Sequence, residues 1–474
     1  MKTKPWPHQA KELIDHWGAP ARAMLWQQRS GKSKVIIDEL CLWARRKGLR
    51  SAIIVAPNGV HLNWARREIP AHWWDDVAVS VSTWAPVRTV GKQRELDQLV
   101  KTEGLAVLCV AKNSIRTPAV KKFAKRLLRR GPTALIVDES HHFGSPGAKM
   151  TISARALAKH CAMRRILTGT PVGNSPLRMF SQFELLSPGA LGYSRAEYFN
   201  DRYAVYAGRR EGRNFFKQVV GYDHLDELRE RVAAWATVIL RDDCVGLPPL
   251  IMSRQAYEPS PTQLKAYNTL CDQYIAEIDT RGTLEAMDAG PRLVRLQQLL
   301  SNIAVTDRGT IPVDLEGNPR VAALLESIER PAVVWCRFID SVHQVKAALE
   351  ASGLFVVEHH GGVNLEKRAE AIDLFQLEIA DVFLATPGSA GEGLTLSSAN
   401  SVIWYEHTFD VIQRDQANER ATLRGGKPVP VVDLVAPGTV DDYILENLEN
   451  KRDIAQYLTG EDLKRLIEEI RYGQ

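Results

Sequence analysis

The chain alternates between short, continuously apolar runs and longer amphipathic stretches. The apolar runs form two series. The first series lies at 51–56, 105–110, 134–137 and 165–168, and the second lies at 332–336, 355–358, 382–385, 402–405 and 429–435. Continuous apolar runs are typical of strands that are covered on both faces, as in a parallel sheet. The pattern therefore predicts two parallel sheets, one in each half of the chain.

The stretches between the runs favour helices. In 118–130, apolar residues recur at helical spacing, at Val120, Phe123, Ala124, Leu127 and Leu128. The opposite face is basic and consists of Lys121, Lys122, Lys125, Arg126, Arg129 and Arg130. Such a face is most often solvated, and contact with phosphates is the alternative. Strands that alternate with helices predict the α/β class.

Between the two series the chain becomes polar and helical, with Gly and Pro breaks. We expect a first lobe over 1–180, a helical insertion and inter-lobe linker over 181–320, a second lobe over 321–440, and C-terminal helices over 441–474.

Composition narrows the class of protein. The chain has 474 residues, 45% hydrophobic and 25% charged, which argues against disorder, collagen and coiled coil. No apolar run is long enough to span a membrane, and the N-terminus lacks the apolar centre of a signal peptide. The 6 cysteines lie far apart without a CxxC pair, which argues against a zinc ribbon or a disulfide framework. We expect a cytoplasmic protein.

The net charge is +5, from 61 basic and 56 acidic residues. This balance favours polyanionic partners only mildly, so the case for nucleic acid depends on motifs.

The segment 29–33, Arg-Ser-Gly-Lys-Ser, precedes a helical stretch from Lys34 to Trp43. A phosphate is bound by backbone N–H groups at the start of a helix, with Lys32 for the β- and γ-phosphates and Ser33 for Mg²⁺. The full pattern has Gly six residues before the lysine, where Trp26 stands. A surface loop is the alternative interpretation of this segment alone.

Two adjacent carboxylates, Asp138 and Glu139, follow a buried strand. Ligands bind at the carboxyl ends of such strands, where Asp138 would hold Mg²⁺ and Glu139 would act as general base. The alternative is a transition-metal site formed with His141 and His142, although adjacent residues of a strand point to opposite faces. A Thr-rich turn at 168–171 ends the next strand and would sense the γ-phosphate. Together these segments favour hydrolysis of a nucleoside triphosphate.

From Pro5 to about Lys451 the chain resembles the superfamily two helicase-type ATPases, in particular the Swi/Snf-type translocases of double-stranded DNA. The resemblance rests on segments that occur in the family's order: 6–9, 29–33, 54–64, 138–141, 168–171, 174–188, 241–248, 333–337, 360–375, 383–405 and 413–424. It implies two tandem RecA-like lobes with a helical insertion between them. It also implies ATP and Mg²⁺ as ligands.

The resemblance carries over roles to individual residues. Those implied in catalysis are Lys32, Asp138, Glu139, Arg420 and Arg424. Those implied in ATP binding are Trp6, Gln9, Arg29, Ser30, Gly31, Lys32, Ser33, Thr168 and Gly393, with Ser33 and Asp138 at the metal. Those implied in nucleic-acid binding are Pro57, Asn58, Asn63, Trp64, Thr170, Arg337, His360, Gly361, Thr386 and Gly391.

The last motif departs from the family. Its second arginine is expected three residues after Arg420, where Leu423 stands, and Arg424 follows one position later. Arg29 also stands where relatives have Gly. An arginine at the γ-phosphate contributes orders of magnitude to the rate, so the shifted second arginine of the last motif concerns the efficiency of the motor.

The predicted function is an ATP-dependent translocase on double-stranded DNA, bound through the backbone without sequence preference. One alternative is an RNA or single-strand helicase with the same motor. Another is a non-hydrolysing, nucleotide-gated nucleic-acid-binding module. The family's usual form is a monomeric motor, and the sequence names no protein partner.

Overall fold

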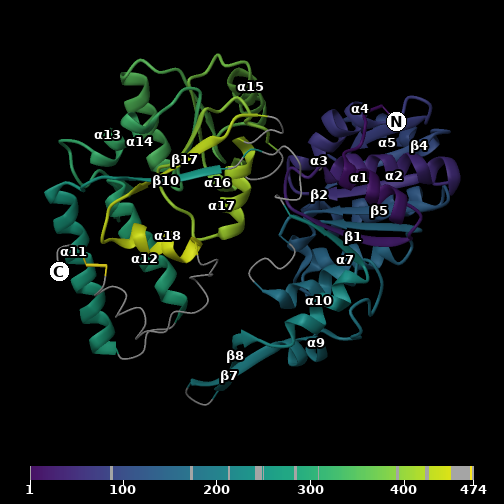
Figure 1. Ribbon diagram of the computed structural model, residues 1–474, viewed down its shortest axis with the longest axis horizontal. Helices are drawn as coiled ribbons and strands as arrows, with labels where there is room; N and C mark the ends of the chain where they lie inside the picture. The colour runs from purple at the N-terminus through teal and green to yellow at the C-terminus, as the bar shows by residue number, and fades with distance from the viewer. Residues whose placement is uncertain are drawn as a thin grey trace. The chain divides into compact units, whose positions relative to one another are not determined.

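The computed structural model describes residues 2–85, 89–170, 175–211, 214–240, 248, 250–281, 286–307, 309–390, 394–421, 426–449 and 470–471. The chain divides into two compact units, Met1–Val245 and Gly246–Gln474 (Figure 1).

The first unit contains a seven-stranded sheet in the order β3-β4-β2-β5-β6-β1-β9. All its neighbouring strands pair in parallel. The strands are β1 Ala21–Trp26, β2 Ser51–Ala56, β3 Val79–Thr83, β4 Leu105–Ala111, β5 Thr133–Asp138, β6 Met163–Leu167 and β9 Ala236–Ile239. The direction in which successive strands are added to the sheet reverses between β2 and β5, and the connecting segments cover both faces. In sheets of this kind, ligands bind at the carboxyl ends of the strands, so we expect a site at that edge.

Helices cover both faces of this sheet. They are α1 Pro7–His16, α2 Lys32–Arg46, α3 Val60–Asn63, α4 Ile69–His72, α5 Val90–Lys101, α6 Pro118–Leu128, α7 Lys149–Ala158, α8 Met179–Phe183, α9 Ala196–Tyr203 and α10 Leu225–Ala233. One core packs α5, α6 and α7 against the sheet, and the other packs α2 and the tryptophans of 64–74. Residues that alternate along β1, such as Ala23 and Met24, enter different cores, as strand geometry requires.

A two-stranded antiparallel hairpin, β7 Ala204–Glu211 and β8 Asn214–Tyr222, follows α9 and forms its own sheet (Figure 1). It contains a register irregularity between Val205 and Tyr206.

The second unit contains a six-stranded sheet in the order β10-β17-β16-β13-β15-β14, again paired in parallel. Its strands are β10 Leu250–Ala256, β13 Ala332–Trp335, β14 Val356–His359, β15 Val382–Ala385, β16 Ser401–Trp404 and β17 Val429–Val435. A short hairpin, β11 Ala304–Thr306 and β12 Gly309–Ile311, stands apart from this sheet.

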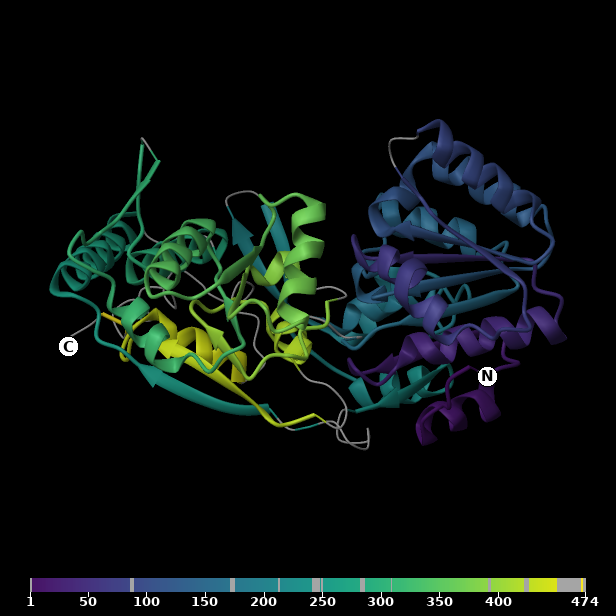
Figure 2. The same cartoon turned by 90° about the horizontal axis from the view of Figure 1, so that it is seen from above.

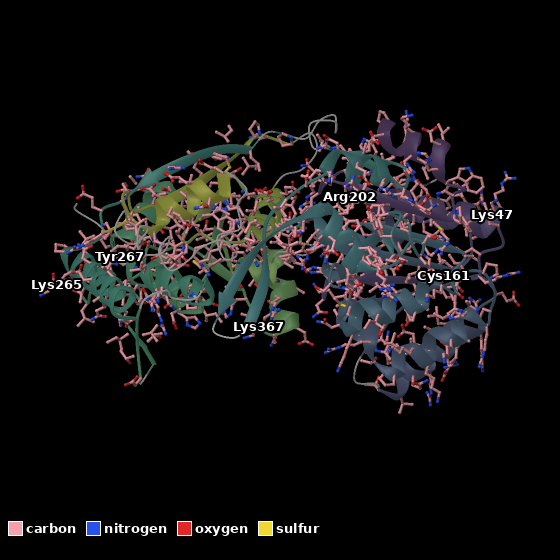
Figure 3. All side chains as sticks on the ribbon, turned by 90° about the horizontal axis from the view of Figure 1, so that it is seen from below. Lys47, Cys161, Arg202, Lys265, Tyr267 and Lys367 are labelled. Carbon is pink, nitrogen blue, oxygen red and sulfur yellow. The ribbon has the colours of Figure 1, made fainter. Side chains whose placement is uncertain are left out.

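The helices of the second unit are α11 Pro261–Arg281, α12 Ala286–Leu300, α13 Pro319–Ser327, α14 Ile339–Ala351, α15 Leu365–Gln376, α16 Pro387–Ala390, α17 Val411–Asn418 and α18 Val440–Glu449. Helices α11 and α12 run side by side (Figure 2). Tyr267 of α11, labelled in Figure 3, is buried and its hydroxyl accepts the backbone N–H of Val440 at 3.0 Å. This contact joins α11 to the start of α18.

The α/β class and its two parallel sheets are confirmed, and every predicted apolar run forms or overlaps a strand. Strands β1, β3, β9 and β10 lie outside the predicted runs. Within the segment 181–320, expected as a helical insertion and inter-lobe linker, β9 pairs with β1 of the first unit and β10 pairs with β17 of the second. The described cysteines are free and buried. A search of the described helices finds none with the length and apolarity for a membrane span.

Candidate functional site

The loop between β1 and α2 has the backbone shape of an anion site. Arg29 and Gly31 adopt left-handed conformations, with φ of 63° and 77°. Alternation of left-handed and right-handed residues turns successive N–H groups toward one point. Helix α2 begins at Lys32, and no side chain caps its first N–H groups. The loop therefore presents backbone donors and a helix N-terminus to a negatively charged ligand.

The side chains of the loop fold back onto the end of β1. Nζ of Lys32 donates to the carbonyl oxygens of Trp26 at 2.7 Å and Gln27 at 3.2 Å. Oγ of Ser30 donates to the same Gln27 carbonyl at 2.7 Å. Ser33 stands in the first turn of α2, half-buried. A lysine and a hydroxyl at the start of this helix suit a phosphate and its divalent cation.

The N-terminal helix α1 holds this loop from the other side. Nε2 of Gln9 donates to the carbonyl oxygens of Ser30 at 3.3 Å and Gly31 at 3.1 Å, and its Oε1 accepts the backbone N–H of Trp6 at 2.8 Å. His8 Nε2 lies 2.8 Å from the Ser30 carbonyl. A Cβ at Gly31 would overlap Nε2 of Gln9. The amide of Gln9 thus positions the phosphate loop.

Asp138 lies at the carboxyl end of β5, and its two oxygens have different partners. Oδ2 accepts the indole N–H of Trp64 at 2.8 Å, and Oδ1 accepts the backbone N–H of Glu139 at 3.0 Å. Burial and the charge of Glu139 raise the pKa of Asp138 to about 6, while the Trp64 hydrogen bond and the charge of Lys32 lower it. The charge of Lys32 at the start of α2 is therefore felt at Asp138 at the end of β5.

Glu139 begins the turn that follows β5, and side chains of this turn contact the residues that follow β6. Its backbone is left-handed, with φ of 48°, a conformation that a residue with a side chain adopts only when its surroundings impose it. Oε2 of Glu139 lies 3.2 Å from Nδ1 of His141. The same Nδ1 lies 3.0 Å from Oγ1 of Thr168 and 3.4 Å from Oγ1 of Thr170. One histidine thus links the second carboxylate to the threonine turn.

The transition-metal alternative gains no support from this geometry. Among the described residues, no group of three or more His, Cys, Asp or Glu side chains is arranged to hold a metal ion. His141 is instead occupied by the threonine turn.

In the second unit the predicted residues also follow the carboxyl ends of strands. Arg337 follows β13; its guanidinium donates to Oε1 of Gln297 at 2.9 Å and packs 4.3 Å from the Phe409 ring centre. Its backbone N–H donates to Oε2 of Glu406 at 2.7 Å. His360 is buried after β14, and Gly361 is exposed beside it. Thr386 follows β15 and donates to Oγ of Ser389 at 2.8 Å. These residues share one edge of the second sheet.

Arg420 lies just beyond α17, half-buried. Its guanidinium donates to the Leu394 carbonyl at 3.3 Å, and its own carbonyl accepts the N–H of Leu396 at 2.9 Å. The neighbouring Arg414 is committed elsewhere, since its Nη2 forms a buried pair with Asp433 at 2.5 and 2.6 Å. Arg420 is thus fixed beside the segment after β15, within the range 383–405 on which the family resemblance rests.

The structure places two predicted nucleic-acid residues in the interior. Trp64 is 1% exposed with its N–H on Asp138, and Pro57 is buried, whereas Asn58 is exposed and Asn63 is half-buried. Trp64 therefore cannot stack on a nucleic acid, and its place is at the carboxylate site. Several predicted residues lie outside the described residues: Pro171, Asn174, Arg241 to Leu247, Gly391, Gly393 and Arg424.

Three contributors escaped sequence reasoning: His8, Gln182 and Glu406. Gln182 Oε1 accepts the hydroxyl of Ser140 at 2.9 Å, which secures the turn after Asp138. Glu406 follows the apolar run of β16, so its position at the carboxyl edge was a usable signal. His8 and Gln182 lie within the segments 6–9 and 174–188, but the sequence assigned no role to either side chain.

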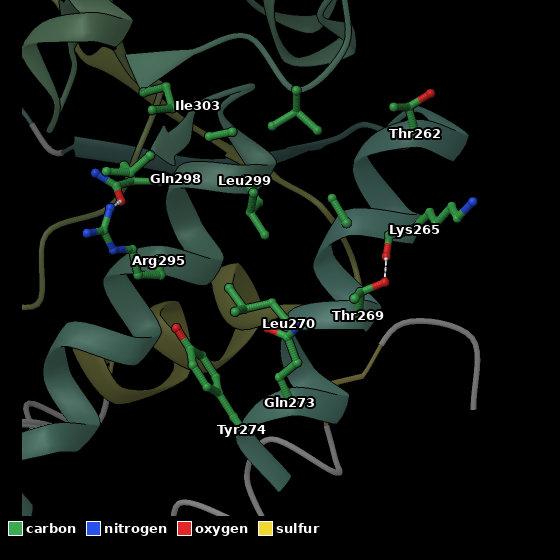
Figure 4. A pocket seen from close by; sticks show the side chains of 14 residues that line it. Thr262, Lys265, Thr269, Leu270, Gln273, Tyr274, Arg295, Gln298, Leu299 and Ile303 are labelled. Carbon is green, nitrogen blue, oxygen red and sulfur yellow. Dashed lines mark hydrogen bonds between the residues drawn. The ribbon is translucent and has the colours of Figure 1, made fainter. Parts of the chain in front are cut away.

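A cavity of about 650 Å³ lies between α11, α12 and the β11–β12 hairpin (Figure 4). Lys265 and Arg295 stand on different helices of its wall, with Leu270 and Leu299 between them. None of the predicted site residues lines this cavity, so it is separate from the candidate ATP site.

Comparison with protein families gives two matches. The SNF2-related domain matches residues 20–302, and the helicase conserved C-terminal domain matches residues 319–425. The chain belongs to the SNF2-related family. The resemblance drawn from the motifs is therefore confirmed, and with it the class of a superfamily two, helicase-type ATPase.

Individual relatives of this SNF2-related chain are distant. It is 25% identical over 385 residues to the TATA-binding protein-associated factor mot1 of Aspergillus fumigatus, covering 69% of this chain and 20% of the relative. It is 20% identical to an ATP-dependent helicase of Mycoplasma genitalium, covering 91% and 39%. It is 23% identical to the mouse DNA excision repair protein ERCC-6, covering 89% and 29%. The chain thus spans about a fifth of the mot1 relatives.

Among solved structures, the Sulfolobus solfataricus SWI2/SNF2 ATPase core in complex with dsDNA matches with a TM-score of 0.42 and 17% identity. The match covers 99% of this chain and 95% of that chain.

Proposed function

We propose that the chain is an ATP-dependent translocase on double-stranded DNA. The observation that carries the proposal is that an SNF2-related chain combines two features. These are the loop 29–32, in which Arg29 and Gly31 are left-handed, and the carboxylates Asp138 and Glu139. The mouse relative is named a DNA excision repair protein, which supports DNA as the substrate. The phosphates of DNA would be held by Asn58, Asn63, Thr170, Arg337, His360, Gly361, Thr386 and Gly391.

The first unit would bind the nucleotide. The N–H groups of Ser30 to Lys32 would hold the β-phosphate, and Lys32 would exchange its carbonyl partners for the γ-phosphate. Ser33 and Asp138 supply the hard oxygen ligands that Mg²⁺ prefers, so the residues present fit this ion, which would offset phosphate charge when bound. Trp6 borders the loop beside Gln9.

In the hydrolytic step, a water oxygen forms a bond to the γ-phosphorus while the bond to the bridging oxygen of ADP breaks. Glu139 would accept the proton of the attacking water. His141, whose Nδ1 lies 3.2 Å from Oε2 of Glu139, would hold this carboxylate in place. Arg420 would stabilise the charge on the γ-phosphate, with Arg424 as the second candidate arginine. The His141 contacts to Thr168 and Thr170 would transmit the state of the γ-phosphate to the DNA-binding turn.

The test is steady-state phosphate release without nucleic acid and with duplex DNA, single-stranded DNA or RNA. We expect the largest stimulation with the duplex, and loss of turnover by about 100-fold or more in Lys32→Ala and Glu139→Gln. Lys47→Ala is the matched control, because Lys47 is exposed at the other end of α2 (Figure 3). Stimulation by RNA or single strands alone would replace the proposal with a helicase on those substrates. Absence of turnover under every condition would leave a nucleotide-gated binding module.

A further inference from the structure

Helices α6 and α7 enclose a groove that the nucleotide site does not use. Two adjoining cavities, of about 420 and 190 Å³, lie between these helices and share Lys121 and Ser153 among their lining residues. Helix α6 contributes residues at 120, 121, 124, 125 and 128, and α7 contributes residues at 152, 153, 156 and 157. Both sets repeat at three and four residues, so each helix lines the groove along one continuous face.

The floor of the groove is apolar. Ile115, Val120 and Ala124 in its narrower cavity are buried in the core, whereas Leu128 and Leu157 are half-buried and remain partly accessible. Ile152 at the wider cavity is 53% exposed and adds a large apolar side chain to the accessible surface of the groove. Exposed apolar groups between two helices favour burial by another apolar surface.

The rim of the groove is basic, and no acidic side chain in its lining neutralises this charge. Arg116, Lys121, Lys125 and Lys149 line the two cavities, and no Asp or Glu does. None of these four side chains forms an ion pair within the described part of the chain. Two other cations of the basic face 121–130 differ, since Arg126 pairs with Asp97 at 2.8 Å and Arg130 donates to the carbonyl of Gly104 at 3.0 Å.

The basic face recognised in the sequence therefore has two parts. Arg126 and Arg130 form contacts within the first unit. Lys121 and Lys125 instead stand four residues apart along the groove, and like charges at this spacing destabilise a helix. An acidic ligand would relieve this repulsion.

We propose that the α6–α7 groove docks an acidic, amphipathic helix of a partner protein. The apolar floor would receive apolar side chains at helical spacing, and the four cations would face Asp or Glu on both sides of that stripe. Residues 120 to 128 span eight helical rises, or about 12 Å, which matches two to three turns of a docked helix. A nucleic-acid backbone would use the cations but would leave the apolar floor unpaired with any apolar group.

The experiment uses the full chain and a labelled synthetic peptide of about four turns, with leucines at i, i+4 and i+7 and glutamates on both flanks. A peptide of the same composition with the leucines dispersed is the control. Binding is followed by fluorescence anisotropy without ATP or DNA, so that the outcome does not depend on the motor function.

We expect the patterned peptide to bind and the dispersed one to bind at least tenfold more weakly. The double variant Lys121→Glu/Lys125→Glu loses about tenfold or more of the affinity, because two attractions become repulsions. Lys122→Glu/Arg129→Glu makes the same charge change on α6 and at its C-cap, outside the cavities, and leaves affinity unchanged. Ile152→Ser weakens binding, whereas Ile14→Ser, also exposed, does not.

The proposal is overturned if the patterned peptide does not bind, or if both charge-reversal pairs affect it equally. It is also overturned if Lys121→Glu/Lys125→Glu weakens binding of duplex DNA but not of the peptide, since the cations would then serve nucleic acid. All variants change exposed side chains, and an unchanged thermal midpoint shows that each is folded.

Discussion

Asp138 is held by two different parts of the first unit. The backbone of Glu139 binds one carboxylate oxygen, and the indole of Trp64 binds the other. Trp64 also begins a short π-helical segment, Trp64–Glu68, and irregular turns of this kind occur frequently at functional sites. The carboxylate that would hold the cation is therefore fixed by the segment expected to approach DNA.

The first prediction concerns pH. Because the pKa of Asp138 is raised to about 6 and its ionised form is the one that serves the cation, kcat/KM for ATP falls as the pH drops through about 6. Trp64→Phe removes a donor to the ionised form, so the acidic limb moves to higher pH. A pH profile of kcat/KM measures both.

The control for Trp64→Phe is Trp74→Phe. Trp74 is buried in the same core and donates to Oδ1 of Asp38 at 2.7 Å, away from the site. Both variants lose about 1–3 kcal/mol of stability, since each leaves a buried carboxylate short of a donor. A shift of the acidic limb in both variants, or in neither, contradicts the role given to Trp64.

The second prediction concerns Gly31. Gly31→Ala imposes a left-handed conformation on alanine and places its Cβ on Gln9, so the affinity for ATP falls by tenfold or more. Gly48→Ala has the same backbone penalty, with φ of 65°, but meets no atom within 4 Å. Titration with a fluorescent ATP analogue should separate them, and equal affinities would show that the contact with Gln9 is irrelevant to the loop.

At the scale of elements, a buried ion pair joins α2 to β6, the two elements that lead from the phosphate loop and into the threonine turn. Arg165 donates through Nε and Nη2 to both oxygens of Glu39, at 2.9 and 2.8 Å, and both side chains are 0% exposed. A paired guanidinium in the core is tolerated because all its charge is matched.

Breaking this pair is expected to destabilise the first unit strongly. Arg165→Met leaves the Glu39 carboxylate buried without its cation and costs about 3–5 kcal/mol. Arg126→Met removes a partly exposed pair with Asp97 and costs about 1 kcal/mol or less. Urea unfolding of both variants measures the difference, and similar midpoints would contradict this assignment.

The elements that the sequence predicted best are the central strands of the two sheets. Continuous apolar runs identified the central strands because both their faces are covered. Strand β1 was missed because Arg22 interrupts its run, although its guanidinium is buried against Glu12 and His16 of α1. Edge strand β3 alternates valine with serine, and β10 has three polar residues in a row, so neither shows the continuous apolar run that marks the central strands.

The candidate site was predictable in its chemistry but not in its contacts. The order of motifs identified Lys32, Asp138 and Glu139, because phosphate chemistry requires these groups after strands. Whether Trp64 points to solvent or to Asp138 depends on packing between segments 74 residues apart, which no local pattern encodes. The same holds for Gln9, whose amide binds the loop 21 and 22 residues away.

At the scale of the whole molecule, the proposed motor would contact the phosphate backbone of DNA. The net charge of +5 is small, so binding depends on local cations at the carboxyl edges of the sheets. Affinity for duplex DNA should be independent of sequence and should fall with salt, by a log–log slope of about 0.9 per phosphate neutralised. Titrations of two unrelated duplexes at several salt concentrations measure this, and a strong preference for one sequence would contradict backbone binding.

The most direct test of the account is displacement of a third strand from a DNA triplex. A translocase that moves along the duplex displaces the third strand when ATP is present, without separating the duplex itself. We expect displacement by the unmodified chain and by Lys47→Ala, and none by Glu139→Gln or with a non-hydrolysable nucleotide. Duplex-stimulated ATP hydrolysis without displacement would contradict the claim that hydrolysis drives movement along double-stranded DNA.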